Sequence, residues 1–380
     1  MTFSLDVDAV KFRSHLVSVM NNYATAGAEL VPVIKGNGYG FGREILASEA
    51  SRLGCNRIAV GTVWELAQTL GNFAGEILVL EPFNANDESA VSQWRQHLEH
   101  HAARVIVTVS NLDLASVKSA GAKNIYLEGK TSLSRFGMLH FDMQSIVSFN
   151  DLKVLGISLH LPIVQPASKV DATTEISSAF NGAALSQSMT EVWNWIVLYQ
   201  EMSDKHSLPK HISLSHVSEK QIQALKTMMQ NYNFDLEIEV RLGTKLWLGE
   251  PSALQASGTV LQIHEVEHRQ NVGYQQTDSG NNKRLIVVSG GTAHGVAMAA
   301  PSNANSMRKK GIAIAEGISQ AIGKVRSPFS YNQKNLDFVE PPHMHVSMLW
   351  SNDLTIAVGD TLDCNVRNTT SNFDCVTGLD

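Results

Sequence analysis

One lysine of the chain stands where covalent chemistry is possible. Lys35 follows the apolar run LVPVI, and four glycines occupy the next seven positions, in KGNGYGFG. A lysine against an apolar wall loses hydration, which lowers the pKa of its ammonium group and frees the amine to attack an aldehyde. Glycines let the backbone pass close to a bulky ligand. A lone lysine after a strand is more often a solvated charge, so both interpretations stay open at this point.

Eight β-branched runs predict the strands that would position this lysine. They cover residues 29–34, 57–60, 76–80, 104–109, 124–128, 154–159, 211–214 and 236–240. The runs are apolar almost without alternation, as in strands covered on both faces, and segments such as 10–20 and 189–202 between them have helical periodicity. We therefore predict an α/β fold, a parallel (β/α)8 TIM-type barrel, with an open doubly wound sheet as the alternative. In the barrel, Lys35 would lie at the carboxyl end of the first strand, where active sites form.

The pattern changes after residue 245. The strand-like segments are LQASGTVLQIHEVEH, KRLIVVSGG, HVSMLWSND and TIAVGDTLDCNV, with a weakly helical piece at 310–323 among them. We interpret this as a second, mostly β domain. The predicted domains are thus a barrel over 1–245 and a C-terminal β domain over 246–380.

Composition excludes several classes of protein. A net charge of −6 over 380 residues gives no reason to expect a nucleic-acid partner. Cys55, Cys364 and Cys375 lack CxxC or framework spacing, which argues against a zinc cluster or a secreted disulfide scaffold. Neither a signal-peptide pattern nor an apolar run of membrane-spanning length is evident. We expect a cytoplasmic protein that binds neither nucleic acid nor membrane.

The string KGNGYGFG resembles the cofactor-lysine signature of the alanine racemase family, in which Asn, Tyr and Gly follow the lysine at these spacings. The resemblance continues in the same order over nearly the whole chain. It implies pyridoxal 5′-phosphate as the cofactor, bound to Lys35 as an aldimine, with Lys35 also serving as the proton base on one face. It further implies that Tyr39 hydrogen-bonds the phosphate or the substrate side.

A second segment, IYLEGKTSLSRFGM, resembles the family stretch whose arginine touches the cofactor phenolate and the substrate carboxylate. That role falls on Arg135, and a planar guanidinium suits carboxylate recognition. Glu128 stands where many members have a carbamylated lysine that holds this arginine, so its carboxylate would take over that task. A surface Arg–Glu pair is the alternative.

Two further segments follow the sixth and seventh predicted strands. His160 ends VLGISLH and, by the resemblance, stacks on the pyridine ring as a neutral imidazole. In HISLSHVS, Ser215 takes the place of the family's phosphate-binding serine, with Leu214 where Asn is common. Alternatively, Ser215 is only a helix N-cap, or Ser218 caps the helix instead.

After the eighth predicted strand, EVRLGTKLW resembles the family's Arg-x-Gly segment. Arg241 thereby inherits the bond to the pyridine nitrogen, and Gly243 and Thr244 inherit backbone contacts to the phosphate. An arginine at this nitrogen keeps the ring a poorer electron sink than a carboxylate would, which suits a brief carbanion-like intermediate.

The resemblance breaks at the second base. Racemisation needs proton transfer on both faces of the substrate Cα, and the family uses a tyrosine of the partner subunit's C-terminal domain. Here VVSGGTAHGVAM puts Thr292 at that tyrosine and His294 two residues on, at the place of an aspartate. A threonine hydroxyl is too weakly acidic for this role, so His294 is the candidate. Leu349 likewise replaces a usual aspartate, and the C-terminus lacks the family's phosphate-contacting tyrosine.

The sequence thus predicts a divergent family member, an amino acid racemase or epimerase that acts as a homodimer with shared active sites. A lyase with the same cofactor, either a decarboxylase or a D-threonine-type aldolase, is one alternative. A cofactor-binding protein without turnover is another. His343 and His345 lie where such aldolases place metal ligands, but no third ligand is evident, so no metal is predicted. The substrate is not specified by the sequence.

Overall fold

The computed structural model describes residues 2–149, 151–163, 187–298 and 325–379, and the predicted helical piece at 310–323 lies outside them. The chain forms two compact units, each built from more than one segment of the sequence. The barrel unit comprises Ser14–Gly36 and Arg43–Gly249, and the β unit comprises Met1–Arg13, Asn37–Gly42 and Glu250–Asp380.

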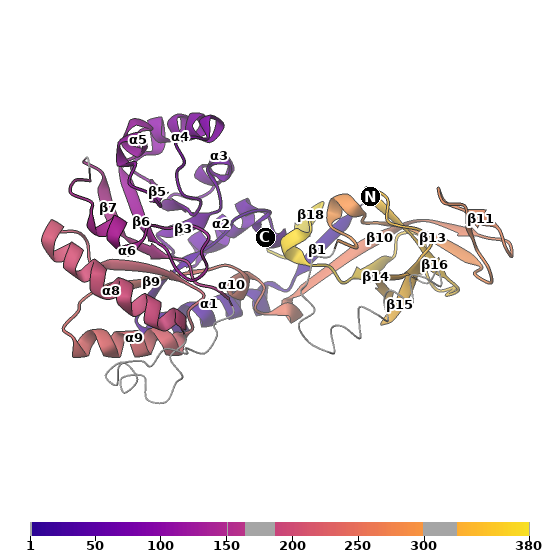
Figure 1. The fold of residues 1–380 in the computed structure, drawn as a ribbon. Coiled ribbons are helices and arrows are strands. Elements are labelled where there is room, and N and C mark those ends of the chain that lie inside the picture. The colour runs from indigo at the N-terminus through magenta and orange to yellow at the C-terminus, as the bar shows by residue number, and fades with distance from the viewer. Residues whose placement is uncertain (1, 150, 164–186, 299–324, 380) are drawn as a thin grey trace. The chain divides into compact units, whose positions relative to one another are not determined.

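The barrel unit contains an eight-stranded parallel sheet, of which several strands are labelled in Figure 1. The order of its strands is β2-β9-β8-β7-β6-β5-β4-β3. A parallel bridge between Val33 and Ala59 joins the first and last strands of this order, so the sheet forms a nearly closed barrel. The strands are β2 (Ala28–Pro32), β3 (Arg57–Val60), β4 (Glu76–Val79), β5 (Val105–Val109), β6 (Asn124–Gly129), β7 (Lys153–Leu159), β8 (His211–Ser215) and β9 (Glu237–Leu242). Each coincides with one of the eight predicted runs, and the (β/α)8 prediction is confirmed.

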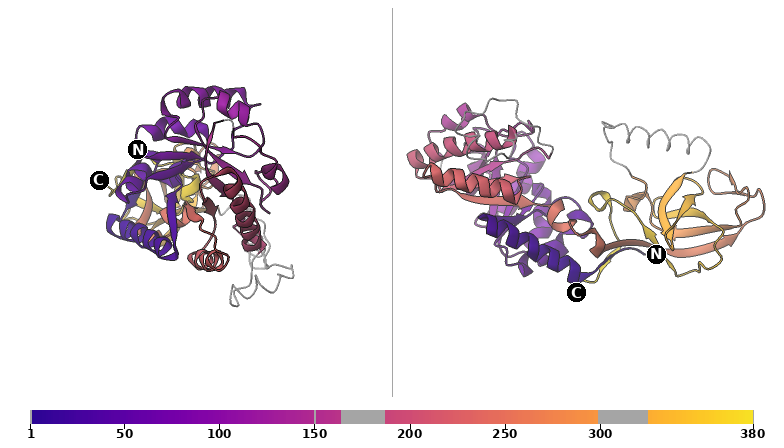
Figure 2. Two further views of the ribbon diagram at one scale, coloured as in Figure 1. Left: turned by 90° about the vertical axis from the view of Figure 1, so that its left-hand side faces the viewer. Right: turned by 90° about the horizontal axis from the view of Figure 1, so that it is seen from below.

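Helices alternate with these strands and lie outside them (Figure 2). They are α1 (Ala9–Ala26), α2 (Arg43–Arg52), α3 (Leu66–Leu70), α4 (Glu88–His101), α5 (Leu114–Ser119), α6 (His140–Gln144), α8 (Gln187–His206), α9 (Glu219–Asn231) and α10 (Thr244–Trp247). Helix α9 illustrates why they pack: Ile222, Leu225 and Met229 recur at helical spacing and are buried. Among the described residues, none of the helices has the length and apolar content needed to span a bilayer.

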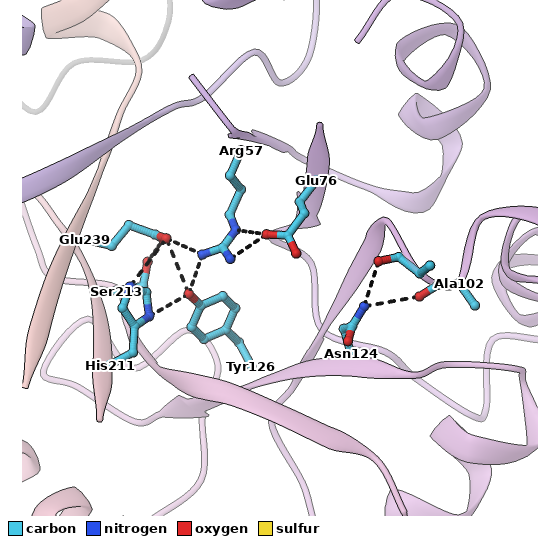
Figure 3. A network of polar contacts seen from close by, with 9 residues as sticks. Arg57, Glu76, Ala102, Asn124, Tyr126, His211, Ser213 and Glu239 are labelled. Carbon is cyan, nitrogen blue, oxygen red and sulfur yellow. Dashed lines mark hydrogen bonds and ion pairs between the residues drawn. The ribbon is translucent and has the colours of Figure 1, made fainter. Parts of the chain in front are cut away.

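A polar network fills one end of the barrel interior (Figure 3). Arg57, the first residue of β3, donates to Glu76 of β4 and, at 2.5 Å, to the fully buried Glu239 of β9. Tyr126 accepts from Arg57 at 2.7 Å, and Ser213 donates to Glu239 at 2.6 Å. Because Arg57 and Glu76 begin their strands, the network lies toward the amino-terminal end of the barrel, opposite the end expected to carry the site.

The β unit contains a second eight-stranded sheet, ordered β13-β16-β15-β14-β17-β10-β1-β18, with an added pairing of β13 to β10. All pairs are antiparallel except β1 with β18. The strands are β1 (Phe3–Val7), β10 (Leu254–Glu265), β13 (Arg284–Ser289), β14 (Arg326–Tyr331), β15 (Lys334–Phe338), β16 (Val346–Ser351), β17 (Thr361–Cys364) and β18 (Cys375–Thr377), with a small hairpin of β11 (Asn271–Val272) and β12 (Thr277–Asp278). The predicted mostly β region is confirmed.

Candidate active site

Lys35 emerges at the carboxyl end of β2, at the mouth of the barrel. The two residues before it are fixed by backbone hydrogen bonds, from Val33 N to Leu242 O and from Ile34 N to Ala59 O, each 2.8 Å long. These bonds tie the end of β2 to β9 on one side and to β3 on the other. The lysine therefore leaves a rigid strand end and its side chain reaches solvent.

The surroundings of Lys35 favour a neutral amine. Its pKa is lowered, first because water is displaced around the ammonium group and then because Arg135 and Arg241 repel its positive charge. Glu65 acts in the opposite direction. A lower pKa increases the fraction of neutral amine, which is the form that can attack an aldehyde or accept a proton.

Arg241, at the carboxyl end of β9, is buried, and only some of its hydrogen-bond donors have partners. Its two terminal nitrogens donate to Ser158 Oγ and to Leu159 O, both at 2.7 Å. Its Nε is buried and makes no hydrogen bond within the described residues. A buried donor without an acceptor costs about 1–3 kcal/mol, so this atom is suited to a ligand acceptor such as a pyridine nitrogen.

Glu128 lies near the end of β6 and is 3% exposed. Its Oε2 makes no hydrogen bond within the described part of the chain. Burial raises the pKa of this carboxyl to about 7, against the opposing effects of Arg241 and then Arg135. Arg241, rather than the Arg135 named by the resemblance, therefore exerts the stronger charge effect on Glu128.

The raised pKa of Glu128 predicts a pH-dependent cost to folding. The folded carboxyl holds its proton up to about pH 7, whereas the unfolded one releases it at the ordinary, lower pKa. Stability is therefore lost as the pH rises through this window, and remains lost above it. Glu128→Gln cannot ionise at this position. We therefore expect its free energy of unfolding, relative to that of wild type, to be higher at about pH 8 than at about pH 4 by on the order of 2 kcal/mol. Urea unfolding at both pH values measures this difference. A free energy of unfolding that falls relative to wild type at the higher pH would contradict the prediction.

His160 follows β7 and is held as a neutral imidazole. Burial and then the charges of Arg241 and Arg135 lower its pKa to about 2. Its ring meets that of His216 edge-on, with centroids 5.4 Å apart. His216, which none of the sequence motifs indicates, follows Ser215 directly and has a left-handed backbone with φ of 56°.

Ser215 and Ser218 have separate tasks. The Ser215 hydroxyl is buried and accepts from Leu161 N at 3.1 Å. Ser218 is the N-cap of α9 and forms a capping box with Gln221. Of the two alternatives for capping, the structure selects Ser218, and the phosphate contact of Ser215 stays a prediction.

The Ser218 cap carries a modest expected effect on stability. Replacing an N-cap serine by alanine removes the acceptor for an otherwise unpaired amide and typically costs about 1 kcal/mol. We expect Ser218→Ala to lower the free energy of unfolding by this amount in urea titrations, and Ser218→Asp to retain it. Equal losses in both variants would exclude capping as the cause.

The remaining barrel residues of the prediction lie in loops after strands. Arg135 is exposed, with its guanidinium 5.1 Å from the centre of the Phe136 ring. No ion pair joins it to Glu128 among the described contacts. Gly243 is the N-cap residue of α10 directly after β9, and the exposed Thr244 begins that helix. Their ligand contacts stay predictions.

Tyr39 belongs to the β unit. It is buried in the short turn Gly38–Gly40 and has a left-handed φ of 54°. This turn is tied to the C-terminal part of the same unit, because the Asn37 side chain donates to Asn368 O at 2.9 Å and to Ser371 O at 2.6 Å. Its contact with phosphate or substrate stays a prediction.

His294, the predicted second base, also lies in the β unit and is buried. Its Nδ1 accepts from Gly291 N at 3.1 Å, which leaves Nε2 to carry the proton and face Asp374 Oδ1 at 3.4 Å. The ring also packs against Phe3 at 5.3 Å. Both ring nitrogens are therefore engaged, so the conformation described gives His294 a structural task, and its catalytic role stays a prediction.

The structure also places the other β-unit residues that the sequence analysis named. Leu349 is fully buried in the core of the β unit with Ile286 and Phe329. Thr292 is exposed. His343 contacts Glu340 at 2.7 Å, and within the described ranges no cluster of three or more His, Cys, Asp or Glu side chains could hold a metal ion.

The barrel unit thus gathers Lys35, Arg135 and Arg241 within electrostatic range of one another. The two guanidinium groups beside Lys35 favour an anionic ligand, and the unpaired Nε of Arg241 favours one with a buried acceptor. Pyridoxal phosphate has both a phosphate and a pyridine nitrogen, so the residues present fit this cofactor. Lys35 would hold its aldehyde carbon, and Arg241 its ring nitrogen.

A lysine-bearing (β/α)8 mouth, combined with a separate antiparallel β unit, defines a two-part barrel protein with a site suited to an aldehyde cofactor. Residues 7–190 match the family description "Alanine racemase, N-terminal domain". These residues carry the N-terminal domain of the alanine racemase family.

Solved structures share this fold. Alanine racemase of Clostridium difficile 630 is 15% identical with a TM-score of 0.65, covering 96% of this chain and 87% of that one. The enzyme from Streptomyces lavendulae is 17% identical with a TM-score of 0.60, covering 97% and 88%. Alanine racemase from Bartonella henselae, solved with covalently bound pyridoxal phosphate, is 16% identical with a TM-score of 0.58, covering 96% and 90%. At these identities the likeness concerns the fold, and no curated protein matches the chain.

Proposed function

We propose that the protein is a pyridoxal 5′-phosphate-dependent amino acid racemase or epimerase in which Lys35 holds the cofactor. The observation that carries this proposal is the position of Lys35 at the carboxyl end of β2, where Arg135 and Arg241 act on its amine and lower its pKa. The match of residues 7–190 to the alanine racemase N-terminal domain supports it, as does the cofactor bound covalently in the Bartonella henselae relative.

Each residue of the barrel mouth has a proposed task. The bound cofactor would supply an electron-withdrawing ring that stabilises negative charge at the substrate Cα. Lys35 would take a proton from Cα and return it, a task that the lowered pKa of its amine favours. Arg241 would donate from Nε to the ring nitrogen and keep a permanent charge there. Ser215, Gly243 and Thr244 would bind the phosphate, His160 would pack on the ring, and Tyr39 would hydrogen-bond the phosphate or the substrate side.

The substrate would be an amino acid. Arg135 binds its carboxylate, since an exposed planar guanidinium at the mouth can make two parallel hydrogen bonds. A second proton carrier is needed on the opposite face, and His294 serves only if it leaves its contacts with Gly291 and Asp374. We further propose a cytoplasmic homodimer in which the partner subunit completes each site.

A lyase is the second candidate function. Thr292 occupies the place of the second-base tyrosine, and Leu349, in the place of an aspartate, is fully buried. A site with a single proton base suits chemistry on one face of the substrate, as in decarboxylation or aldol cleavage. The third candidate is a protein that binds the cofactor without turnover, and the same barrel residues would bind the cofactor in it.

One experiment separates these functions. The cofactor-loaded chain is incubated in deuterium oxide with a panel of L- and D-amino acids, and products are analysed by chiral chromatography and mass spectrometry. The proposal predicts deuterium at Cα together with interconversion of the enantiomers. Release of carbon dioxide or an aldehyde supports the lyase, and bound cofactor without any product excludes both enzymes. Chain reduced beforehand with borohydride serves as the control.

A further inference from the structure

We propose that Glu65 is a positioning residue for Lys35, which fixes the backbone next to the lysine and opposes the neighbouring positive charges. This inference rests on the proposed function in one respect, namely that Lys35 binds the cofactor and transfers the proton. Neither the lysine signature nor the family resemblance pointed to Glu65, which lies 30 positions further along the chain.

The Glu65 carboxylate joins the ends of two barrel strands. It ends the short helix Val63–Glu65 that follows β3. Its Oε1 accepts from Gly36 N at 3.0 Å, and its Oε2 accepts from Gly61 N at 2.7 Å. Gly36 follows Lys35 and Gly61 follows β3, so one side chain holds both strand ends at the mouth.

The peptide groups around Gly36 are held from a second direction as well. Arg43 donates from one terminal nitrogen to Gly36 O, and from the other to Gln68 Oε1 at 2.5 Å. Both backbone polar groups of Gly36 are thereby bound by charged side chains. Its φ of +67° is a conformation that glycine adopts without strain. The residue after Lys35 is therefore fixed in a bend, which limits where the lysine side chain can start.

Close packing allows Glu65 to reach this position. A Cβ added to Gly61 would meet Glu65 Oε1 at 3.0 Å and Lys35 Cβ at 3.1 Å. A side chain at residue 61 would thus push against both the lysine and the carboxylate. The absence of that side chain lets the carboxylate approach the backbone beside Lys35.

Several charged groups face Lys35 from different strands. Arg135 from the loop after β6 and Arg241 from β9 lower the pKa of Lys35, whereas Glu65 raises it. His160 after β7 and His216 after β8 also interact with Lys35, and both have lowered pKa values, so they are neutral near pH 7. Glu65 thus limits how far the two guanidinium groups depress the lysine pKa. A proton carrier that must both accept and return a proton works best with a pKa near the operating pH.

The test measures the reactivity of Lys35 directly. Full-length chain freed of cofactor is acetylated with acetic anhydride over a range of pH, and the extent of labelling at Lys35 is quantified by peptide mass spectrometry. Glu65→Gln keeps one acceptor and removes the charge, whereas Glu65→Asp keeps the charge and shortens the reach. Glu81→Gln is the matched control, because exposed Glu81 also follows a strand at this end but does not act on Lys35.

We expect the labelling midpoint of Glu65→Gln to fall by about 0.5–1 pH unit, less than for a fully buried pair because Glu65 is partly exposed. Labelling below the midpoint then rises about three- to tenfold. Glu65→Asp should keep the wild-type midpoint yet bind pyridoxal phosphate more weakly, since one carboxylate no longer reaches both amides.

An unchanged midpoint in Glu65→Gln, or an equal fall in Glu81→Gln, overturns the charge effect. Wild-type cofactor affinity in Glu65→Asp overturns the positioning effect. Because acetylation needs neither cofactor nor turnover, the labelling results are independent of whether the proposed function is found. The Glu65→Asp affinity needs cofactor binding but no turnover.

Discussion

Lys35→Ala is expected to lose amino acid turnover by about 10⁴-fold or more, because in the proposed mechanism this one residue supplies both the cofactor attachment and a proton base. Alanine at this place has no amine to bind an aldehyde and none to remove a proton from Cα. The rate of deuterium incorporation at Cα, measured with saturating cofactor, gives the loss. The variant should also fail to retain pyridoxal phosphate through gel filtration.

Lys130→Ala is the matched control for this experiment. Lys130 is also exposed and directly follows β6 at the same end of the barrel, but it is not part of the proposed site. Its variant should keep wild-type turnover and cofactor. If Lys35→Ala retained more than a small fraction of the wild-type rate, Lys35 could not be the residue that carries the chemistry.

Arg57→Met is expected to cause the largest loss of stability, about 3–5 kcal/mol. The variant would leave the Glu239 carboxylate, which has no solvent exposure, without its cationic partner. The hydroxyl of Tyr126 would lose a donor at the same time. Urea unfolding followed by circular dichroism measures the free energy of unfolding of wild type and variant.

Two further variants show whether the buried charge is the cause. Glu76→Gln should cost less than about 1 kcal/mol, since the Glu76 side chain is 39% exposed and exposed ion pairs contribute little. Combining Arg57→Met with Glu239→Gln should recover part of the loss, because no charge is then left buried. If the double variant were as unstable as the sum of the single ones, lost packing rather than charge would explain the result.

The barrel was predictable because its strands carry a local signal. Runs such as RVIVTV are apolar and β-branched, and β5 buries every one of its residues. Strand β1 gave no such signal. FSLDV alternates in burial and becomes a strand through partners far along the chain, β10 and β18. Pairings over such separations cannot be derived from local periodicity.

The division of the chain into units also depends on distant contacts. The sequence predicts domains that are continuous, whereas the compact β unit includes Met1–Arg13 and Asn37–Gly42. The segment with Tyr39 joins that unit through Asn37 and its bonds to Asn368 and Ser371. The polar network of Arg57 and Glu239 inside the barrel was equally inaccessible, because its residues are widely spaced in the sequence.

The candidate site was predictable where a motif contains the residue. Lys35, Arg135 and Arg241 were found through their segments, and the structure brings them within range of one another. Glu65 and His216 were missed, because a glutamate in a helical turn and a histidine beside a serine have no distinctive spacing. The engaged nitrogens of His294 could not be foreseen either, since they depend on the fold of the β unit.

Covalent attachment of the cofactor tests the central proposal most directly. The purified chain is loaded with pyridoxal phosphate, reduced with borohydride, digested and analysed by tandem mass spectrometry. We predict a phosphopyridoxyl group on Lys35, in the peptide that contains KGNGYGFG. Labelling confined to other lysines, or no labelling at all, would contradict the assignment of Lys35 and with it the proposed function.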